Sequence, residues 1–468
     1  MLEGAPGVVL DVRLLTPLSS YSSKPGFPVT ALVMGSLGTE DAASVPPGST
    51  IRGTVTRVHK VGLGLVHESA RLDLEFHELE LPGGFKCPLR VRLVAIENAR
   101  EAVDRRGNIR GVRATGNLSH RAGFSFAFLP SLSPMGYLPL FLVSTCLFRF
   151  PEPEIVYPSG TDMHLQVLQA LLLPPIKNPP RSAVTMSRQE LEALEALVAS
   201  EPDTSFTKRQ GAPMDLINLM FVGSEEALER VFRAAGWTGA RRMSTGSGLR
   251  AMRAVVEARP YRDAPMRTLL VDGAEPDMTW QKSLNTFMKR DHLRIWRRPA
   301  AWQGQPLWLS AVTREAGLGF SFRYGFVHKT EVDLDLERED VVRDLRLTGC
   351  VARVARVRRP EVARRYAQPG MRDAQTDGAI TAVLLNSCQS PRLGRPPGAP
   401  PQTPGQTRRL VRRVVLSARN HYFRNNLVWE AVDLTRAGVR WAHHRREAKR
   451  EPPPATEVAL RSASGKVE

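Results

Sequence analysis

Apolar and polar residues alternate along the first third of the chain. The alternation is clearest over residues 9–14, 51–58 and 71–76. A period of two residues is the pattern of a strand with one buried face. Proline and glycine form turns between these runs, at residues 24–26, 46–49 and 82–84. Short strands separated by such turns predict an all-β domain, either a barrel or a sandwich, over residues 1–175.

A loose repeat links the two ends of this predicted β domain. Residues 7–15 are echoed by residues 160–168, with apolar and polar positions in similar places. One interpretation is that the last strand of the domain lies near the first. The other is that two amphipathic strands resemble each other by chance.

The pattern changes near residue 175. Residues 174–186 are rich in proline and predict a linker. A helix follows, because Ser187 and Glu190 have the spacing of a capping box. The apolar residues that share one face of this helix are Leu191, Leu194 and Val198. We therefore assign residues 176–212 to a linker and a helix.

Residues 213–388 alternate between strand and helix patterns. The run 215–222 is apolar enough for a central strand, and Ser224 is placed to cap the helix that follows it. A second helix is predicted over residues 247–259, and a third from Asp333 or Asp335 to Leu347. Further strands are predicted at 269–271, 292–297, 306–313, 317–323, 350–357 and 378–386. The chain is therefore predicted to be multi-domain, with an α/β or α+β domain after the β domain.

Charge changes the picture only at the C-terminal end. The 468 residues carry a formal net charge of +18. Residues 346–468 hold 24 Lys and Arg against 9 Asp and Glu, which is a net charge of +15. This distribution predicts a Pro/Gly-rich linker at 389–407 and a basic, partly disordered segment at 408–468, rather than a domain that reads nucleic acid. A solvated tail is one interpretation of this segment, and peripheral contact with anionic lipid is the alternative.

Cysteine spacing and apolar run length exclude several classes. The four cysteines, Cys87, Cys146, Cys350 and Cys388, form no C-x-x-C pair, so neither a zinc ribbon nor a redox dithiol is predicted. We expect free or buried thiols, with a disulfide as the alternative. The N-terminus lacks the pattern of a signal peptide. The longest apolar stretch, 137–148, is shorter than the roughly 20 residues of a membrane-spanning helix. A start codon further upstream stays open.

An ordered series of short motifs runs through residues 213–386. They are 218–224 (NLMFVGS), 235–237 (AGW), 260–265 with two Pro, 290–296 (RDHLRIW), 307–309 (LWL), His328, 333–338 (DLDLER) and 376–378 (TDG). This series resembles the LssY C-terminal domain family. The resemblance implies the fold of that family and a setting at the bacterial cell envelope, and it implies no particular reaction. Where the family tends to have paired histidines, this chain has Asp291-His292 and His328-Lys329.

The N-terminal part has a second resemblance. Residues 49–55, 71–72 and 79–84 resemble the β-barrel domain of TrbI-type conjugation-channel proteins in their turns and strand pattern. This resemblance implies a barrel and implies nothing about conjugation.

The predicted strand at 292–297 carries the first group of candidate residues. His292, Arg294 and Trp296 share one of its faces. Arginine is a forked donor to phosphate or carboxylate, and histidine can act as an acid or a base. We therefore assign His292 a catalytic role, and Arg294 and Trp296, together with Trp308, a role in ligand binding. The alternative is a solvent-facing strand with Trp296 packed under a loop.

A short acidic cluster beside a histidine forms the second group. His328 and Asp333 are the candidate catalytic residues, and Asp335 and Glu337 are candidate ligand-binding residues. Together they could orient a base or bind a divalent metal, although no cofactor is expected and no metal ligand is assigned. The alternative is that Asp333 or Asp335 caps a helix and Glu337 lies in its first turn.

Two functions follow from these patterns. We expect a non-enzymatic binding or scaffold protein of the bacterial envelope, whose partner is another protein or an anionic ligand. The alternative is a hydrolase of a phosphorylated or anionic substrate that uses His292, Arg294 and His328 with Asp333 or Asp335. An enzyme would need these side chains to converge in one cleft.

Overall fold

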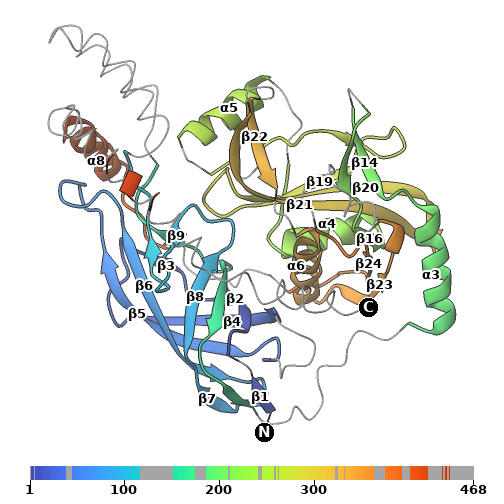
Figure 1. The fold of residues 1–468 in the computed structure, drawn as a ribbon, viewed down its shortest axis with the longest axis horizontal. Coiled ribbons are helices and arrows are strands. Elements are labelled where there is room, and N and C mark those ends of the chain that lie inside the picture. The colour runs from blue at the N-terminus through green and yellow to red at the C-terminus, as the bar shows by residue number, and fades with distance from the viewer. Residues whose placement is uncertain are drawn as a thin grey trace, which may run out of the picture.

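A barrel-like sheet and an α/β region lie side by side in the computed structural model (Figure 1). The structure describes residues 2–4, 6–37, 45–115, 151–173, 186–208, 211–240, 245–257, 260–261, 263–321, 325–330, 333–362, 375–392, 401–419, 435, 438–439 and 442.

The barrel region is built on a nine-stranded sheet. In chain order its strands are β2 (Val9–Leu14), β4 (Pro28–Leu37), β5 (Thr50–His59), β6 (Arg71–Glu80), β7 (Lys86–Pro88), β8 (Val91–Ile96), β9 (Ala102–Val103), β10 (Ile109–Arg110) and β12 (Asp162–Val167). Their order in the sheet is β8-β12-β2-β4-β5-β6-β10-β9, and β7 pairs with β6. The sheet curls until it is nearly closed, which confirms the predicted all-β barrel. Two short ladders complete the region, β1 (Leu2–Gly4) with β13 (Leu171–Leu173) and β3 (Leu18–Ser19) with β11 (Val156–Tyr157).

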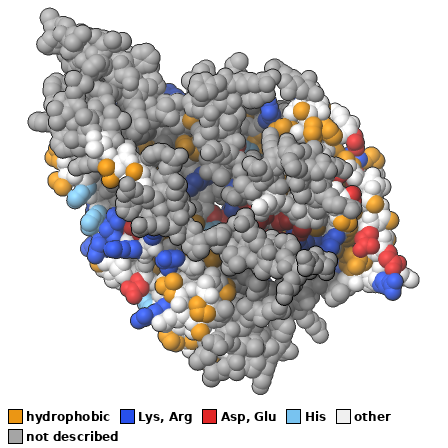
Figure 2. Space-filling view, in the orientation of Figure 1, with side chains coloured by type: hydrophobic (Ala, Val, Ile, Leu, Met, Phe, Trp, Pro, Cys, Tyr) orange, Lys and Arg blue, Asp and Glu red, His pale blue; other side chains and the backbone are white. Residues whose placement is uncertain are grey.

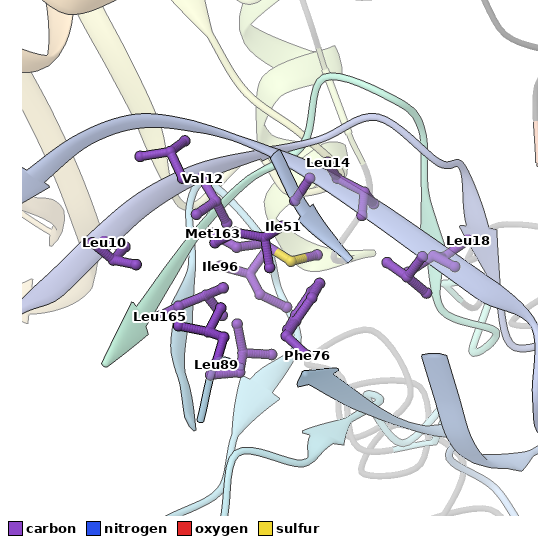
Figure 3. Packing of buried hydrophobic residues seen from close by; sticks show 14 of the residues in the cluster. Leu10, Val12, Leu14, Leu18, Ile51, Phe76, Leu89, Ile96, Met163 and Leu165 are labelled. Carbon is purple, nitrogen blue, oxygen red and sulfur yellow. The ribbon is translucent and has the colours of Figure 1, made fainter. Parts of the chain in front are cut away.

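Alternation along β2 sorts its side chains between two environments. Leu10, Val12 and Leu14 point into the barrel core and are fully buried, beside Ile51 and Leu165 (Figure 3). The residues between them, Asp11 and Arg13, point outward, and yet they are buried too. A second part of the molecule therefore covers this outer face.

The internal echo reflects a real neighbour relation. Strand β12 pairs with β2 in antiparallel fashion, with Asp162 opposite Arg13 and His164 opposite Asp11. Of the two interpretations of the repeat, the first is confirmed, because the last long strand of the barrel lies beside the first.

The α/β region is an eight-stranded sheet of order β17-β19-β20-β21-β16-β24-β23, with β22 paired to β21. Its strands are β16 (Leu219–Val222), β17 (Thr238–Gly239), β19 (Met278–Lys282), β20 (Arg290–Trp302), β21 (Gln305–Ser321), β22 (Gly325–Thr330), β23 (Val351–Val357) and β24 (Ile380–Leu385). A smaller sheet consists of β14 (Thr204–Thr207), β15 (Pro213–Leu216) and β18 (Leu269–Leu270). The helices are α3 (Arg188–Ser200), α4 (Glu225–Ala234), α5 (Thr245–Val256) and α6 (Leu334–Leu347).

Helices and the smaller sheet cover both faces of the large sheet. Apolar residues of α4 and α6 pack on one face, with Leu293 and Ile295 of β20. Residues of α3 and the neighbourhood of β18 pack on the other face, with Trp296. Only β16 and β24 run parallel, while the other pairs are antiparallel. The predicted α/β or α+β fold is confirmed.

Capping chemistry sets the helix starts as predicted. Ser187 and Glu190 form a complete capping box on α3, and the Ser224 side chain accepts a hydrogen bond from the Ala227 amide at the start of α4. Of the two candidate starts for the last of these helices, Asp333 is the N-cap. Strands β14, β17, β19 and β22 were not predicted. The single strand expected over 215–222 is divided between β15 and β16, which belong to different sheets, and the two strands expected at 306–313 and 317–323 are one long strand, β21.

Part of the basic C-terminal segment is a helix that packs on the barrel. Helix α8 (Gln406–Arg419) lies at the end of the barrel where β5 turns into β6 (Figure 1). Arg412 is buried and pairs with Glu152 and, at 2.9 Å, with Glu154. The expectation of a solvated tail is therefore wrong for this helix. Residues 443–468 lie outside the described residues.

A disulfide links the ends of two neighbouring strands of the α/β region. Cys350, which precedes β23, is bonded to Cys388, which follows β24. The expectation of free thiols is wrong for this pair, because folding brings together two residues that are 38 positions apart. Cys87 is free, and Cys146 lies outside the described residues.

Loss of this disulfide should destabilise the protein. The double substitution Cys350→Ser and Cys388→Ser is expected to lower the free energy of unfolding by about 2–4 kcal/mol, because the unfolded chain regains a loop that the bond had closed. Urea unfolding of the oxidised wild type and of the variant measures the difference. Cys87→Ser is the control and should change little. If reduction leaves the wild-type unfolding midpoint unchanged, the bond is absent in solution.

Candidate functional site

The barrel region and the α/β region meet through charged side chains. Figure 2 shows acidic and basic side chains gathered in the hollow between the two halves of the molecule. We call these residues the interface charge cluster. Its members are Asp11, Arg13, Glu97, Asp162 and His164 from the barrel region, and Lys282, Asp291, Arg314, Glu337, Asp340, Arg343 and Asp344 from the α/β region.

Four of these residues form a ring of alternating charge. Arg13 donates two hydrogen bonds to Asp162, at 2.7 and 2.8 Å, and a third to Asp344, at 2.7 Å. Lys282 donates to the same two carboxylates, at 2.8 and 2.7 Å. Since Arg13 and Asp162 belong to the barrel region and Lys282 and Asp344 to the α/β region, the ring crosses the interface. The indole of Trp237 also donates to Asp344, at 3.2 Å.

Arg314 is the centre of the second half of the cluster. Its guanidinium lies 2.8 Å from Asp291, 2.9 Å from Glu337, 3.0 Å from Asp340 and 3.7 Å from Glu97. Only Glu97 among these carboxyl groups comes from the barrel region. The barrel residue Asn98 adds a hydrogen bond of 2.9 Å to Asp291. One arginine of β21 thus holds carboxyl groups from both sides of the interface.

His164 and Arg343 complete the network. The Nδ1 atom of His164 lies 2.6 Å from Asp11 and its Nε2 atom lies 3.2 Å from Glu97. Burial lowers the pKa of His164, but its hydrogen bonds with Asp11 and Glu97 outweigh this and raise the pKa to about 10. The ring is therefore an imidazolium at neutral pH. Arg343 of α6 crosses the interface to pair with Asp11 and also pairs with Asp340.

The cluster holds more carboxyl groups than basic groups. Seven carboxyl groups face five basic groups, with His164 counted among the basic ones. Burial raises the pKa of Glu337 well above its ordinary value, against the opposing effect of Arg314. Burial and the nearby Glu97 raise the pKa of Asp340 to about 7, although Arg343 and Arg314 lower it. Two retained protons would make the buried network neutral, which a medium of low polarity favours.

Glu97 and Asp162 of the cluster remain ionised. Burial raises the pKa of Glu97, but Arg314 and His164 outweigh it and hold the pKa well below its ordinary value. Arg13 and Lys282 likewise overcome burial and lower the pKa of Asp162 to about 2. The protons therefore reside on the side of α6, where carboxyl groups crowd one another.

The cluster is closed to small molecules. The two cavities lined by its side chains have volumes of about 10 and 40 Å³. These are spaces for one or a few water molecules. Among the residues that the structure describes, no group of three or more His, Cys, Asp or Glu could hold a metal ion. The arrangement can join two regions and exchange protons, and it offers no room for a substrate.

The first predicted group of site residues lies outside the interface charge cluster and is buried. His292, Arg294 and Trp296 do share one face of β20, but all three side chains are buried. His292 lies 3.2 Å from Glu315, and Arg294 pairs with Asp215 at 2.8 Å. Burial lowers the pKa of His292, against the opposing effect of Glu315. The solvent-facing alternative is therefore wrong for this face.

The second predicted group divides between capping and the interface charge cluster. The Asp333 side chain accepts hydrogen bonds from the amides of Asp335 and Leu336, as an N-cap does. Asp335 pairs with Arg338 and accepts hydrogen bonds from Thr376 and from the Asp377 amide. Glu337 faces Arg314 in the cluster. Each of these carboxyl groups thus has partners within the protein.

The structure does not bring the two predicted groups together. Leu293 and Ile295 of β20 pack with α6, so His292 and Arg294, which alternate with them, lie on the opposite face of the sheet from Asp333 and Asp335. The backbone of His328 lies in β22, opposite Leu318 of β21. Its side chain lies outside the described residues. Trp308 is buried and donates to the Gly223 carbonyl at 2.9 Å.

Sequence patterns missed most of the interface charge cluster, although two signals pointed to it. Asp11 and His164 occupy matching positions of the two echoed segments, and antiparallel pairing of the two strands also sets Arg13 opposite Asp162. In α6, Glu337, Asp340 and Asp344 follow the spacing of one helical face. Each pattern alone is typical of a solvated surface, so only their meeting in the fold makes them an interface.

Comparison with known proteins identifies the α/β region. Residues 198–380 match the family described as the LssY C-terminus. The resemblance predicted from the motifs of residues 213–386 is therefore confirmed, with a match that begins in α3 and ends at the start of β24. A comparison with curated proteins found no match. The TrbI-type resemblance of the barrel region stays a prediction.

Within the described residues, no helix is both long enough and apolar enough to cross a membrane.

Substitution of Arg13 should be far more costly than substitution of an exposed arginine. We expect Arg13→Ala to lower the free energy of unfolding by about 3–5 kcal/mol, because it removes the guanidinium that two buried carboxylates share. Arg52→Ala is the matched control, since Arg52 is exposed and pairs with Glu80 at 2.9 Å on a neighbouring barrel strand. Its effect should stay within about 1 kcal/mol. If urea unfolding shows that Arg13→Ala and Arg52→Ala lower the free energy of unfolding equally, the ion pairs of Arg13 at the interface contribute no more than an exposed pair does.

Substitution of Asp340 should change how stability depends on pH. The raised pKa of Asp340 means that its contribution to stability is present below pH 4 and is lost as the pH rises through about 7. Asp340→Asn cannot ionise, so its stability relative to the wild type should increase from pH 5 to pH 8, by roughly 1–3 kcal/mol. Urea unfolding across this range measures the difference.

Asp104→Asn is the control for this experiment. Hydrogen bonds from Asn108 outweigh burial and lower the pKa of Asp104 to about 2. Its difference from the wild type should therefore be constant between pH 5 and pH 8. A constant difference for Asp340→Asn as well would mean that Asp340 carries no proton in the folded protein.

Proposed function

We propose that this protein is a non-enzymatic binding or scaffold protein of the bacterial cell envelope. In this proposal the LssY C-terminus region holds and orients the barrel region, and the outer surface of the joined molecule meets the partner. The observation that carries the proposal is the interface charge cluster. A set of twelve converging ionisable groups joins the two halves of the protein, and its cavities of about 10 and 40 Å³ leave no room for a substrate.

The predicted site residues also support a structural use of the charges. Arg294 pairs with Asp215, and Asp333 caps α6. His292 is buried beside Glu315 and faces away from the side of the sheet that carries α6. A general acid or base needs to reach a reacting atom within hydrogen-bond distance. The hydrolase alternative therefore receives less support from this geometry than the binding alternative does.

Two observations support an envelope setting. The first is the match of residues 198–380 to the LssY C-terminus, whose resemblance implies such a setting. The second is the disulfide between Cys350 and Cys388. Disulfides form and persist in oxidising compartments such as the bacterial periplasm, and they are rare in the cytosol.

An assay of hydrolysis tests the non-enzymatic part of the proposal. The full-length protein is incubated with a phosphomonoester and a phosphodiester, with and without Mg²⁺, Mn²⁺ or Zn²⁺. We expect no turnover above that of the buffer, either for the wild type or for His292→Gln. His292→Gln retains a polar side chain beside Glu315 and serves as the comparison. Turnover by the wild type that His292→Gln abolishes would establish the hydrolase instead.

Fractionation of bacterial cells that express the full chain tests the setting. We expect the protein to sediment with the envelope fraction. A protein that stays entirely with the soluble fraction would contradict the envelope part of the proposal.

A further inference from the structure

One surface of the molecule combines exposed apolar side chains with arginine. It is formed by the β5–β6 loop, residues 60–70, and by helix α8. In the loop, Leu65 and Val66 are 62% and 80% exposed, and in the helix Leu410 is 59% exposed. The other exposed apolar side chains of this surface are Leu63, Val411 and Val414. We call these six residues the apolar tip.

The loop and the helix form one continuous surface. Leu416 of α8 packs so closely on Gly64 that a Cβ atom there would lie 2.5 Å from the leucine side chain. Arg412 donates to the Gly62 carbonyl at 2.6 Å. Arg419 donates to the Gly64 carbonyl and pairs with Glu68. These contacts hold the helix on the loop, so the six apolar side chains belong to a single end of the barrel.

Helix α8 presents its apolar residues away from the barrel. Arg412 and Leu416, one turn apart, are buried against the barrel. Leu410 and Val414 are also one turn apart, and both are exposed, with Val411 beside them. Val411 and Val414 are therefore directed outward, while Leu410, although exposed, also lines a cavity of about 440 Å³ that α8 forms with residues 151–153. Such an arrangement is typical of a surface that meets a partner.

The charge around the apolar tip has one sign. Helix α8 contains five arginines and no Asp or Glu, and residues 60–67 contain Lys60 and no Asp or Glu. Arg408 and Arg409 are exposed beside the tip. Three carboxyl groups of the barrel region are paired with arginines of the helix: Glu68 with Arg419, Glu154 with Arg412, and Glu152 with Arg412 and the exposed Arg409. The outward surface is therefore apolar and basic.

We infer that the apolar tip docks on an anionic membrane surface, with α8 lying in the plane of the bilayer interface. Aliphatic side chains flanked by arginine are the combination that inserts between lipid headgroups and attracts anionic ones. Charge complementarity argues for this partner over a second copy of the chain, because two basic tips would repel each other. The inference rests on the proposed envelope role and names the partner that this role would require.

Vesicle sedimentation with the full-length protein tests the inference. The vesicles contain either phosphatidylcholine alone or phosphatidylcholine with about one third phosphatidylglycerol. We expect binding to the anionic vesicles that is at least about tenfold tighter than binding to the neutral ones. Binding should weaken at high salt because the Debye length shortens to about 3 Å at 1 M.

Paired variants assign the binding to the apolar tip. Leu65→Ser with Val66→Ser, and separately Arg408→Glu with Arg409→Glu, should each weaken binding by about tenfold or more. Val94→Ser with Leu168→Ser is the matched control, since both side chains are exposed and lie outside the tip. Retained binding by the control, with circular dichroism unchanged in all variants, supports the inference.

Three results would overturn the inference. They are equal binding to both kinds of vesicle, absence of binding by the folded wild type, and equal loss of binding in the control. Self-association that Leu65→Ser with Val66→Ser abolishes, without lipid binding, would assign the tip to a second copy. The cell fractionation separates the two proposals. If the protein sediments with the envelope but does not bind lipid vesicles, the envelope role stands and the docking of the tip on lipid is wrong.

Discussion

The ion pairs of Arg13 and Arg314 are the constraint on which the arrangement of the molecule depends. Arg13 projects from the barrel region into two carboxylates, one of them on α6, while Arg314 projects from the α/β region and reaches Glu97 of the barrel region. Buried charges are stable only when their partners are in place, and breaking one pair leaves another charge unsatisfied. The relative position of the two regions is therefore tied to the geometry of these pairs more strictly than an apolar contact would tie it, since apolar contacts have no fixed direction.

The interface charge cluster, which joins the two regions, also contains the carboxyl groups whose pKa values are raised most clearly. Perturbed pKa values often mark catalytic sites, but networks of structural ion pairs perturb pKa values as well. Here the raised pKa of Asp340 and the raised pKa of Glu337 occur beside a cavity of about one water, among groups that face the other half of the protein. Because carboxyl groups outnumber basic groups, the protonation of the interface charge cluster changes with pH, as it can in a structural network of ion pairs. In the proposed binding role, the outer surfaces, such as the apolar tip, are the places where a partner is met.

The interface charge cluster and the apolar tip lie on different parts of the barrel region. The interface charge cluster lies on the outer face of β2 and β12, and the apolar tip is formed by the β5–β6 loop with α8. The proposed scaffold role needs this separation, because a surface that holds two regions together cannot also be free for a partner. The disulfide between Cys350 and Cys388 adds a covalent restraint within the α/β region, where it links the start of β23 to the segment after β24. The molecule thus combines restraint on the inside with an exposed apolar and basic surface at one end.

Local chemistry determined much of the fold. Alternation along β2 predicted which residues face the barrel core, the capping serines Ser187 and Ser224 set the starts of α3 and α4, and the ordered motifs of the α/β region predicted its family. Tertiary structure alone decided the candidate site. Asp11 and Arg13 have the pattern of a solvated strand face, and only the packing of α6 against that face, through Asp344 and Arg343, buries them. His292 and Asp333 likewise have chemistry suited to a shared site, but the sheet lies between them. A sequence records which side chains alternate and which residues cap, because these depend on neighbours along the chain. It does not record which charged face will lose its water, because that depends on a surface that is hundreds of residues away.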